Sequence, residues 1–189
     1  MTKIDIISGF LGAGKTTFIK KMIEEVFKGE KIVLIENEFG EVGIDGGFLN
    51  VAEFAKKTGM PFVASHSNAR AITAHPRNLP DMYIRKLSEA GGVMGLNFAS
   101  HFLSDTQPPD GESRICDMVT HILHIRKIAG SEVLAIGSDF DGVESRMEID
   151  SPAKMVMLYE TLHQTGLSED ELEKIFYKNA QRVLTAVLR

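Results

Sequence analysis

The sequence predicts an α/β fold with a five-stranded, mostly parallel, doubly wound sheet in the order 2-1-3-4-5 and helices on both faces. Short apolar runs rich in β-branched residues alternate with segments of helical periodicity, which is the pattern of consecutive βα units. The length of 189 residues, with 43% hydrophobic and 25% charged residues, is typical of one globular domain. We therefore expect residues 1–189 to form a single α/β domain.

The individual elements follow from local patterns. Strands are expected at 4–7, 31–35, 61–64, 93–98 and 133–136. Helices are expected at 16–28, 48–57, 79–90, 112–129, 153–164 and 168–188. Ser168 and Glu171 have the spacing of a capping box, which marks the start of the last helix. Right-handed crossovers leave few topologies, of which a flavodoxin-like or P-loop-like order is predicted.

Composition excludes several classes of function. The net charge is −5, so no broad basic surface is expected to bind DNA or RNA. No apolar run approaches the roughly 20 residues of a membrane-spanning helix, and the first residues lack the pattern of a signal peptide. The single cysteine, Cys116, excludes an intrachain disulfide and is expected to be buried. We expect a cytoplasmic protein that binds neither nucleic acid nor membrane, with its oligomeric state left open.

A glycine-rich loop between the first predicted strand and helix has the spacing of a phosphate-binding motif. Residues 9–16 (GFLGAGKT) fit the Walker A pattern G-x-x-x-x-G-K-[ST], in the strand–loop–helix context that the motif requires. Such loops direct backbone N–H groups and a helix N-terminus at phosphate oxygens, while the lysine contacts phosphates and the hydroxyl contacts Mg²⁺. The expected phosphate-binding residues are Gly9, Gly12, Ala13, Gly14, Lys15, Thr16 and Thr17, with Thr16 also on Mg²⁺.

Two segments of the first 45 residues extend this pattern. They are residues 7–17 (ISGFLGAGKTT) and 35–45 (IENEFGEVGID), and together they resemble the CobW-type metallochaperone GTPases. The resemblance implies a P-loop β-α-β segment over 1–45 that binds Mg²⁺ with ATP or GTP, with Glu38 and Glu41 near the metal. The sequence lacks the family's C-x-C-C motif, an evident Walker B strand and an N-K-x-D element. The choice of base is therefore left open, and little or no hydrolysis is expected.

Four later segments carry a second pattern. They are residues 61–70 (PFVASHSNAR), 75–81 (HPRNLPD), 91–98 (GGVMGLNF) and 136–143 (IGSDFDGV). They resemble the membrane (renal) dipeptidase family of zinc peptidases, which implies that 46–189 holds three βα units of a (β/α)₈ barrel. By this resemblance His66 is a zinc ligand, Arg77 holds the substrate carboxylate and Asp139 is the active-site aspartate. Independently, His66 and Asp139 each follow a predicted strand, at the edge where α/β sites gather.

The second resemblance is incomplete at the metal. The family's amino-terminal H-x-D pair, bridging glutamate and D-V-S-H segment do not occur in this sequence. A catalytic zinc takes three protein ligands and a water, whereas His66 and Asp139 supply two. We therefore expect His66, Arg77 and Asp139 to be inherited remnants, with no bound zinc and no catalytic residue. His121 and His124 are three positions apart on a predicted helix, and we expect them on its solvated face.

The two resemblances together favour a chimera with its seam near 43–47. Because each segment stays close to its family, we interpret the chain as a deliberate fusion of fold fragments. Its expected function is binding of phosphate or Mg²⁺–nucleoside triphosphate at the P-loop, since such a loop is made largely by its own backbone and helix. A structural scaffold without a ligand, and an incomplete metal-dependent hydrolase site at His66 and Asp139, are the alternatives.

Overall fold

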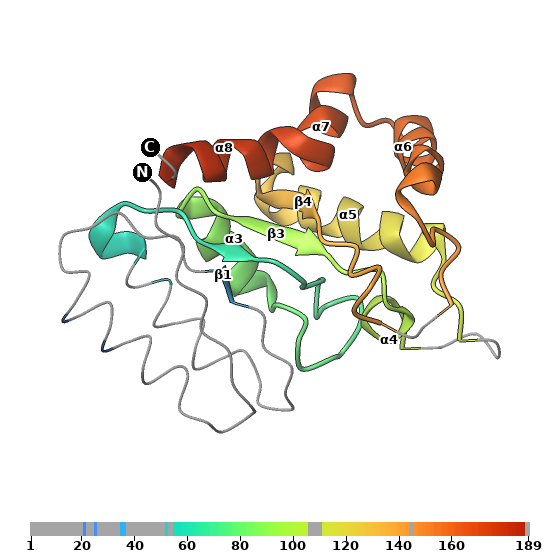
Figure 1. Cartoon of the computed structure of the whole chain (residues 1–189), viewed down its shortest axis with the longest axis horizontal. Coiled ribbons are helices and arrows are strands. Elements are labelled where there is room, and N and C mark those ends of the chain that lie inside the picture. The colour runs from blue at the N-terminus through green and yellow to red at the C-terminus, as the bar shows by residue number, and fades with distance from the viewer. Residues whose placement is uncertain are drawn as a thin grey trace.

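The structure is a computed structural model that describes residues 21, 25, 35–36, 52, 55–105, 111–143 and 146–187. Within these residues four strands form one parallel sheet (Figure 1). The strands are β1 (Ile35–Glu36), β2 (Val63–Ala64), β3 (Val93–Leu96) and β4 (Leu134–Ile136), hydrogen-bonded in that order. The predicted α/β class and parallel sheet are confirmed.

The predicted strand order is wrong. β1 pairs directly with β2, with Ile35 opposite Val63, whereas the order 2-1-3-4-5 places another strand between them. When consecutive crossovers keep the same right-handed sense, each new strand is added on the same side of the last one. Over its four described strands the sheet is therefore wound in one direction without a reversal point, as in a (β/α) barrel. The described part of the sheet has four strands and not the predicted five, and the strand predicted at 4–7 lies outside the described residues.

The helices predicted at 79–90, 112–129 and 153–164 agree with the structure to within a few residues, whereas those predicted at 16–28 and 48–57 lie mostly outside the described residues. The described elements are α3 (Asp81–Glu89), α4 (Ser100–Leu103), α5 (Ile115–Ala129), η2 (Ser131–Val133), η3 (Pro152–Lys154), α6 (Met155–Gln164), α7 (Glu169–Glu173), η4 (Lys174–Lys178) and α8 (Asn179–Val187). The short α4 was not predicted. The helix predicted at 168–188 is divided by η4, a single π-helical turn, into α7 and α8. Among the described helices, none is long and apolar enough to cross a membrane.

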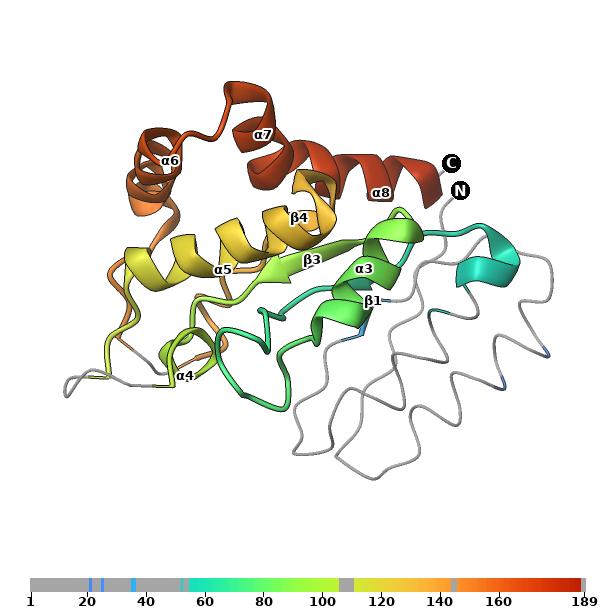
Figure 2. The ribbon, with the colours of Figure 1, turned by 180° about the vertical axis from the view of Figure 1, so that it is seen from behind.

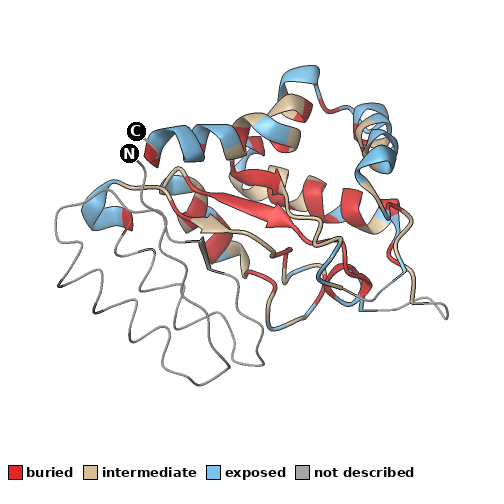
Figure 3. Cartoon of the chain, viewed as in Figure 1, coloured by how far each residue is buried: buried red, intermediate tan, exposed pale blue. Residues whose placement is uncertain are grey.

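Both faces of the sheet are buried against helices. α3 and α5 lie side by side over one face, where strand residues such as Met94 and Leu134 join the main hydrophobic core (Figure 2). Val93 and Ala135 alternate with these residues, so their side chains point to the opposite face. There they pack with Val183 of α8. Figure 3 shows the resulting buried β3 between helices whose outer sides are exposed.

A side chain of α8 covers the outer edge of β4. The Asn179 amide Nδ2 donates hydrogen bonds to the carbonyl oxygens of Ser131 and Leu134, at 2.8 Å each. Arg182, one turn later, donates to the Glu132 carbonyl at 2.9 Å. Side chains of α8 thus donate to these backbone carbonyls in place of a further strand. The outward-facing carbonyl of Leu134 is therefore not left exposed as an edge that another strand could pair with.

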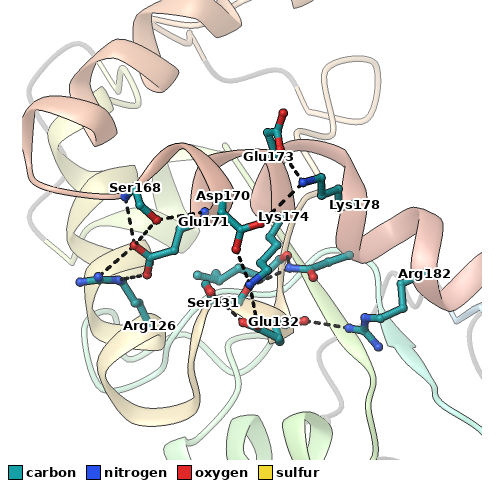
Figure 4. A network of polar contacts seen from close by, with 12 residues as sticks. Arg126, Ser131, Glu132, Ser168, Asp170, Glu171, Glu173, Lys174, Lys178 and Arg182 are labelled. Carbon is teal, nitrogen blue, oxygen red and sulfur yellow. Dashed lines mark hydrogen bonds and ion pairs between the residues drawn. The ribbon is translucent and has the colours of Figure 1, made fainter.

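Ion pairs fasten α7 and η4 to the preceding helices (Figure 4). Arg126 of α5 donates from Nε and Nη2 to the two carboxylate oxygens of Glu171, at 2.6 and 3.0 Å. Glu171 also completes the predicted capping box with Ser168, which is confirmed. Lys174 reaches Glu132 of η2 at 2.9 Å. The network fixes the carboxyl-terminal helices against α5 and the entrance of β4.

Candidate functional site at the carboxyl edge of the sheet

The segments that leave β2, β3 and β4 bring polar side chains to one edge. His66 comes two residues after β2, Asn97 directly follows β3, and Asp139 comes three residues after β4. His66 Nε2 lies 3.8 Å from Asp139 Oδ1. Ser67 Oγ donates to the Arg77 carbonyl at 3.2 Å, so the loop that carries Arg77 lies beside the segment that follows β2. The structure therefore brings together the predicted His66, Arg77 and Asp139.

Two glycines explain how His66 reaches Asp139 although β3 lies between their strands. A Cβ atom at Gly95 would lie 2.2 Å from the Ser65 carbonyl oxygen, and one at Gly137 only 2.1 Å from it. No side chain fits at either position, so the backbone at Ser65 can cross over the ends of β3 and β4. This crossing carries His66 toward Asp139, and Ser65 Oγ lies 2.7 Å from His66 Nδ1.

Asp139 is held by its neighbours on two sides. Its backbone has a φ of 62°, a left-handed conformation in which aspartate is more common than most residues. Its carbonyl accepts the Gly142 N–H at 3.0 Å, which closes a turn. Asn97 Nδ2 donates to Asp139 Oδ2 at 2.9 Å. Asn97 was missed by the sequence analysis, although its position directly after a buried strand is a usable signal.

Below the site lies a network of buried asparagine side chains. Asn68, Asn78 and Asn97 are at most 1% exposed. Asn68 exchanges two hydrogen bonds with the Asn97 backbone, accepting N–H at 2.8 Å and donating to C=O at 2.9 Å. Asn78 in turn accepts the Asn68 N–H at 3.2 Å. Because buried amides that keep their partners hold one geometry, this network fixes the floor of the site.

The loop that carries Arg77 is clamped along its backbone. Arg70 donates from Nε and Nη2 to the carbonyl oxygens of the residues on either side of Arg77, at 2.7 Å each. Ser67 Oγ donates to the Arg77 carbonyl at 3.2 Å. The Arg77 guanidinium lies over the Phe102 ring, 4.9 Å from its centroid. Burial lowers the pKa of Arg77, and the Asp139 carboxylate acts in the opposite direction.

The prediction of a solvated face is wrong for His121. Its side chain is fully buried, and its Nδ1 accepts the Ala69 N–H at 3.1 Å. The ring therefore donates from Nε2 to the Leu103 carbonyl at 3.0 Å. Burial is the main cause that lowers the pKa of His121 to about 4. His124 does not join it on a metal and instead lies 2.9 Å from Asp81.

Cys116 also differs from its prediction. The thiol was expected in the core, whereas the structure places Cys116 on the exposed face of α5. The neighbouring Ile115 and Met118 are buried in its place.

The described residues do not complete a zinc site. No group of three or more His, Cys, Asp or Glu side chains in the described part of the chain is arranged to hold a metal ion. A catalytic zinc takes three protein ligands, whereas His66 and Asp139 are a pair. The predicted P-loop residues and Glu38 and Glu41 lie outside the described residues.

Two family profiles match the chain. The profile of the CobW/HypB/UreG nucleotide-binding domain matches residues 3–65. The profile of the membrane dipeptidase family, peptidase family M19, matches residues 45–189. The chain therefore combines segments of two families, as the sequence predicts.

Related proteins resemble the second segment. An uncharacterized protein in the pqqA 5′ region of Klebsiella pneumoniae is 38% identical over 127 residues, which are 67% of this chain and 47% of that protein. An uncharacterized dipeptidase of Schizosaccharomyces pombe is 33% identical over 128 residues, which are 67% of this chain and 30% of that protein. The chain thus spans less than half of the length of these curated relatives.

A solved structure agrees with the fold. The metallopeptidase of Rhodobacter sphaeroides, liganded with a phosphinate mimic of the dipeptide L-Ala-D-Ala, superposes with a TM-score of 0.67 and 30% identity. The match covers 75% of this chain and 39% of that one. The family profile covers well over half of the sequence. The chain belongs to the membrane dipeptidase family, peptidase family M19.

Proposed function

We propose that the carboxyl edge of the sheet binds an amino acid or a short peptide through its carboxylate. The observation that carries the proposal is the clamped Arg77, whose backbone is fixed by Arg70 and Ser67 and whose guanidinium rests on Phe102. A guanidinium held in place binds a carboxylate at a small entropic cost. Asp139 supplies the negative group that an ammonium requires, so the site has the charge pattern of a zwitterion.

The proposal concerns binding and not turnover. In the described part of the chain, His66 and Asp139 have no third His, Cys, Asp or Glu beside them to hold a zinc ion. Support for the ligand class comes from the family, because the R. sphaeroides relative holds a dipeptide mimic. We therefore propose a substrate-binding portion of a dipeptidase-type site, with the metal-dependent reaction incomplete.

The test is calorimetric titration of the full chain with L-Ala-L-Ala. Arg77→Gln should weaken binding about tenfold or more, because a hydrogen bond to a charged group contributes about 1.5–3 kcal/mol. Arg85→Gln is the matched control, since Arg85 is exposed on α3 and its guanidinium donates to the Ile128 carbonyl, away from the site. Equal affinity of Arg77→Gln and the unchanged chain would refute the proposal.

A second binding function is supported by the CobW-type match at 3–65 and by the Walker A spacing of residues 9–16. We propose that this loop binds phosphate or Mg²⁺–ATP or Mg²⁺–GTP, with little hydrolysis. Titration with each nucleotide, alongside Lys15→Ala, tests it directly. Binding that persists unchanged in Lys15→Ala would contradict it. If the folded protein shows no heat of binding in any titration with peptide, nucleotide or zinc, it is a structural scaffold without a ligand.

The origin of the chain is a related proposal. Two profiles meet and overlap over residues 45–65, close to the seam expected at 43–47. This overlap supports a fusion of two fold fragments, which we propose was made deliberately. Separate expression of 46–189 gives a test, because a fragment that carries its own core should retain a cooperative unfolding transition. Failure of that fragment to fold would count against two joined units.

A further inference from the structure

Two histidines lie beside the Arg77 loop and take no part in the site described above. The rings of His75 and His101 have centroids 5.6 Å apart. Both rings contact Phe102, with centroid distances of 4.5 Å for His75 and 4.0 Å for His101. Phe102 is 3% exposed, so it acts as a buried platform under the two imidazoles. His101 itself is exposed and His75 is half-buried, which leaves His101 within reach of a ligand.

The same platform carries Arg77. Its guanidinium lies 4.9 Å from the centroid of the Phe102 ring, so the two imidazoles and the guanidinium share one aromatic neighbour. Burial is the main cause that lowers the pKa values of His75 and His101. The charge of Arg77 lowers both further, His101 also lowers the pKa of His75, and the Asp139 carboxylate acts in the opposite direction on His101. Positive and N–H-donating groups are thus concentrated at this point of the edge.

The nearby carboxylates already have partners. Asp105 accepts the Ala74 N–H on both oxygens, at 3.1 and 3.3 Å. Asp139 accepts from Asn97 and faces His66. His75 Nδ1 accepts the Arg77 N–H at 3.2 Å, which fixes the ring orientation relative to the Arg77 loop. Among the described residues, therefore, neither imidazole is in an ion pair or hydrogen bond with a carboxylate, although the charge of Asp139 acts on His101 from farther away. The donors suit an anion supplied by a ligand.

We infer that His75 and His101 form, beside Arg77, a subsite for a second acidic group of the ligand. The inference rests on the proposed function, since Arg77 must hold the first carboxylate. The ligand class is then a peptide or amino acid whose carboxyl-terminal residue has an acidic side chain of aspartate or glutamate type. An imidazole donates an N–H in its neutral form as well as in its charged form, so the subsite serves at neutral pH.

The test compares two nearly isosteric dipeptides, L-Ala-L-Asp and L-Ala-L-Asn, by calorimetry at pH 7. The unchanged chain should bind L-Ala-L-Asp about tenfold more tightly, the difference expected for one hydrogen bond to a charged group. In His101→Gln this preference should fall toward unity, while L-Ala-L-Asn keeps its affinity. His101→Arg should restore the preference, because its guanidinium again places N–H donors at this position. His163→Gln is the control, since His163 lies on α6 beside Glu169.

The outcomes separate the two proposals. If both dipeptides bind equally well to the unchanged chain, the second-anion subsite is overturned and the Arg77 site stands. If the preference survives in both His101→Gln and the double variant with His75→Gln, the two histidines are not its source. If neither dipeptide binds to a chain that circular dichroism shows to be folded, the carboxylate site itself is refuted, and the subsite with it.

Discussion

Replacing Gly137 by alanine tests how the end of β2 crosses to the site. The new Cβ would lie 2.1 Å from the Ser65 carbonyl oxygen, whereas ordinary contacts begin at 3.4 Å. Ser65 is backbone at this point and has no flexible side chain end to move aside. We therefore expect the crossing segment to shift by about 1 Å, as overpacked sites do.

The cost follows from the packing. Overpacking of this kind destabilises a protein by about 1–3 kcal/mol. For a chain of this length, 1 kcal/mol corresponds to a melting temperature change of roughly 2–4 °C. Urea unfolding followed by circular dichroism measures the loss in the free energy of unfolding. Calorimetry of L-Ala-L-Ala binding measures the effect on the site. Binding should weaken, because the displaced segment carries His66 away from Asp139.

Gly59→Ala is the matched control. Gly59 has a φ of +68° and no atom within 4 Å of its would-be Cβ, so this variant carries only the backbone cost. That cost is about 1 kcal/mol. It should lower stability without altering ligand affinity. If Gly137→Ala is as stable as the unchanged chain and binds equally well, the close crossing of Ser65 is wrong.

Three further predictions concern stability. Arg126 holds the pKa of Glu171 below its usual value, so the stability that this ion pair contributes is present at neutral pH and lost as pH falls through the folded pKa. Glu171→Gln should cost below about 1 kcal/mol at pH 7 and should reduce the fall in unfolding free energy at acid pH, measured by urea unfolding at a series of pH values. An unchanged fall at acid pH would contradict this. His121 has a folded pKa of about 4 against 6.5 unfolded, so stability should fall by about 3 kcal/mol as pH drops from 6.5 to 4; His121→Asn should remove that slope, and an equal slope in both proteins would refute the assignment. Asn179→Ala removes the side-chain donor from the Leu134 carbonyl, whereas the Ser131 carbonyl keeps the Leu134 N–H, and the change should cost about 1–2 kcal/mol by urea unfolding; unchanged stability would contradict the edge contact.

Local patterns predicted most of the described elements. The apolar spacing of α5 and the capping box at Ser168 act within a few residues, so they can be found by inspection. Strand pairing is different, because it joins segments that lie far apart in the chain. Ile35 pairs with Val63 as a result of how successive βα units wind, and no residue near either strand specifies that choice.

The residues of the candidate site also differ in how far the sequence alone could predict them. His66 and Asp139 could be predicted because each follows a strand and matches a family segment. The buried Asn68 and Asn78 gave no such signal, since hydropathy places asparagine outside the core and only their partners keep them inside. His121 did carry a signal, because it lies three positions after Met118 and four before Ile125 on the buried face of α5.

The contact between Asn179 and β4 has a consequence for the order of events during synthesis. Asn179 follows Leu134 by 45 positions, so the outer side of β4 is translated well before the amide that covers it. At roughly 5–20 residues per second this interval lasts about 2–9 s. During that time β4 of the nascent chain has unpaired carbonyl groups at its outer edge, which could pair with a strand of another chain. A chaperone that shields this edge until α8 docks would therefore raise the yield of folded protein.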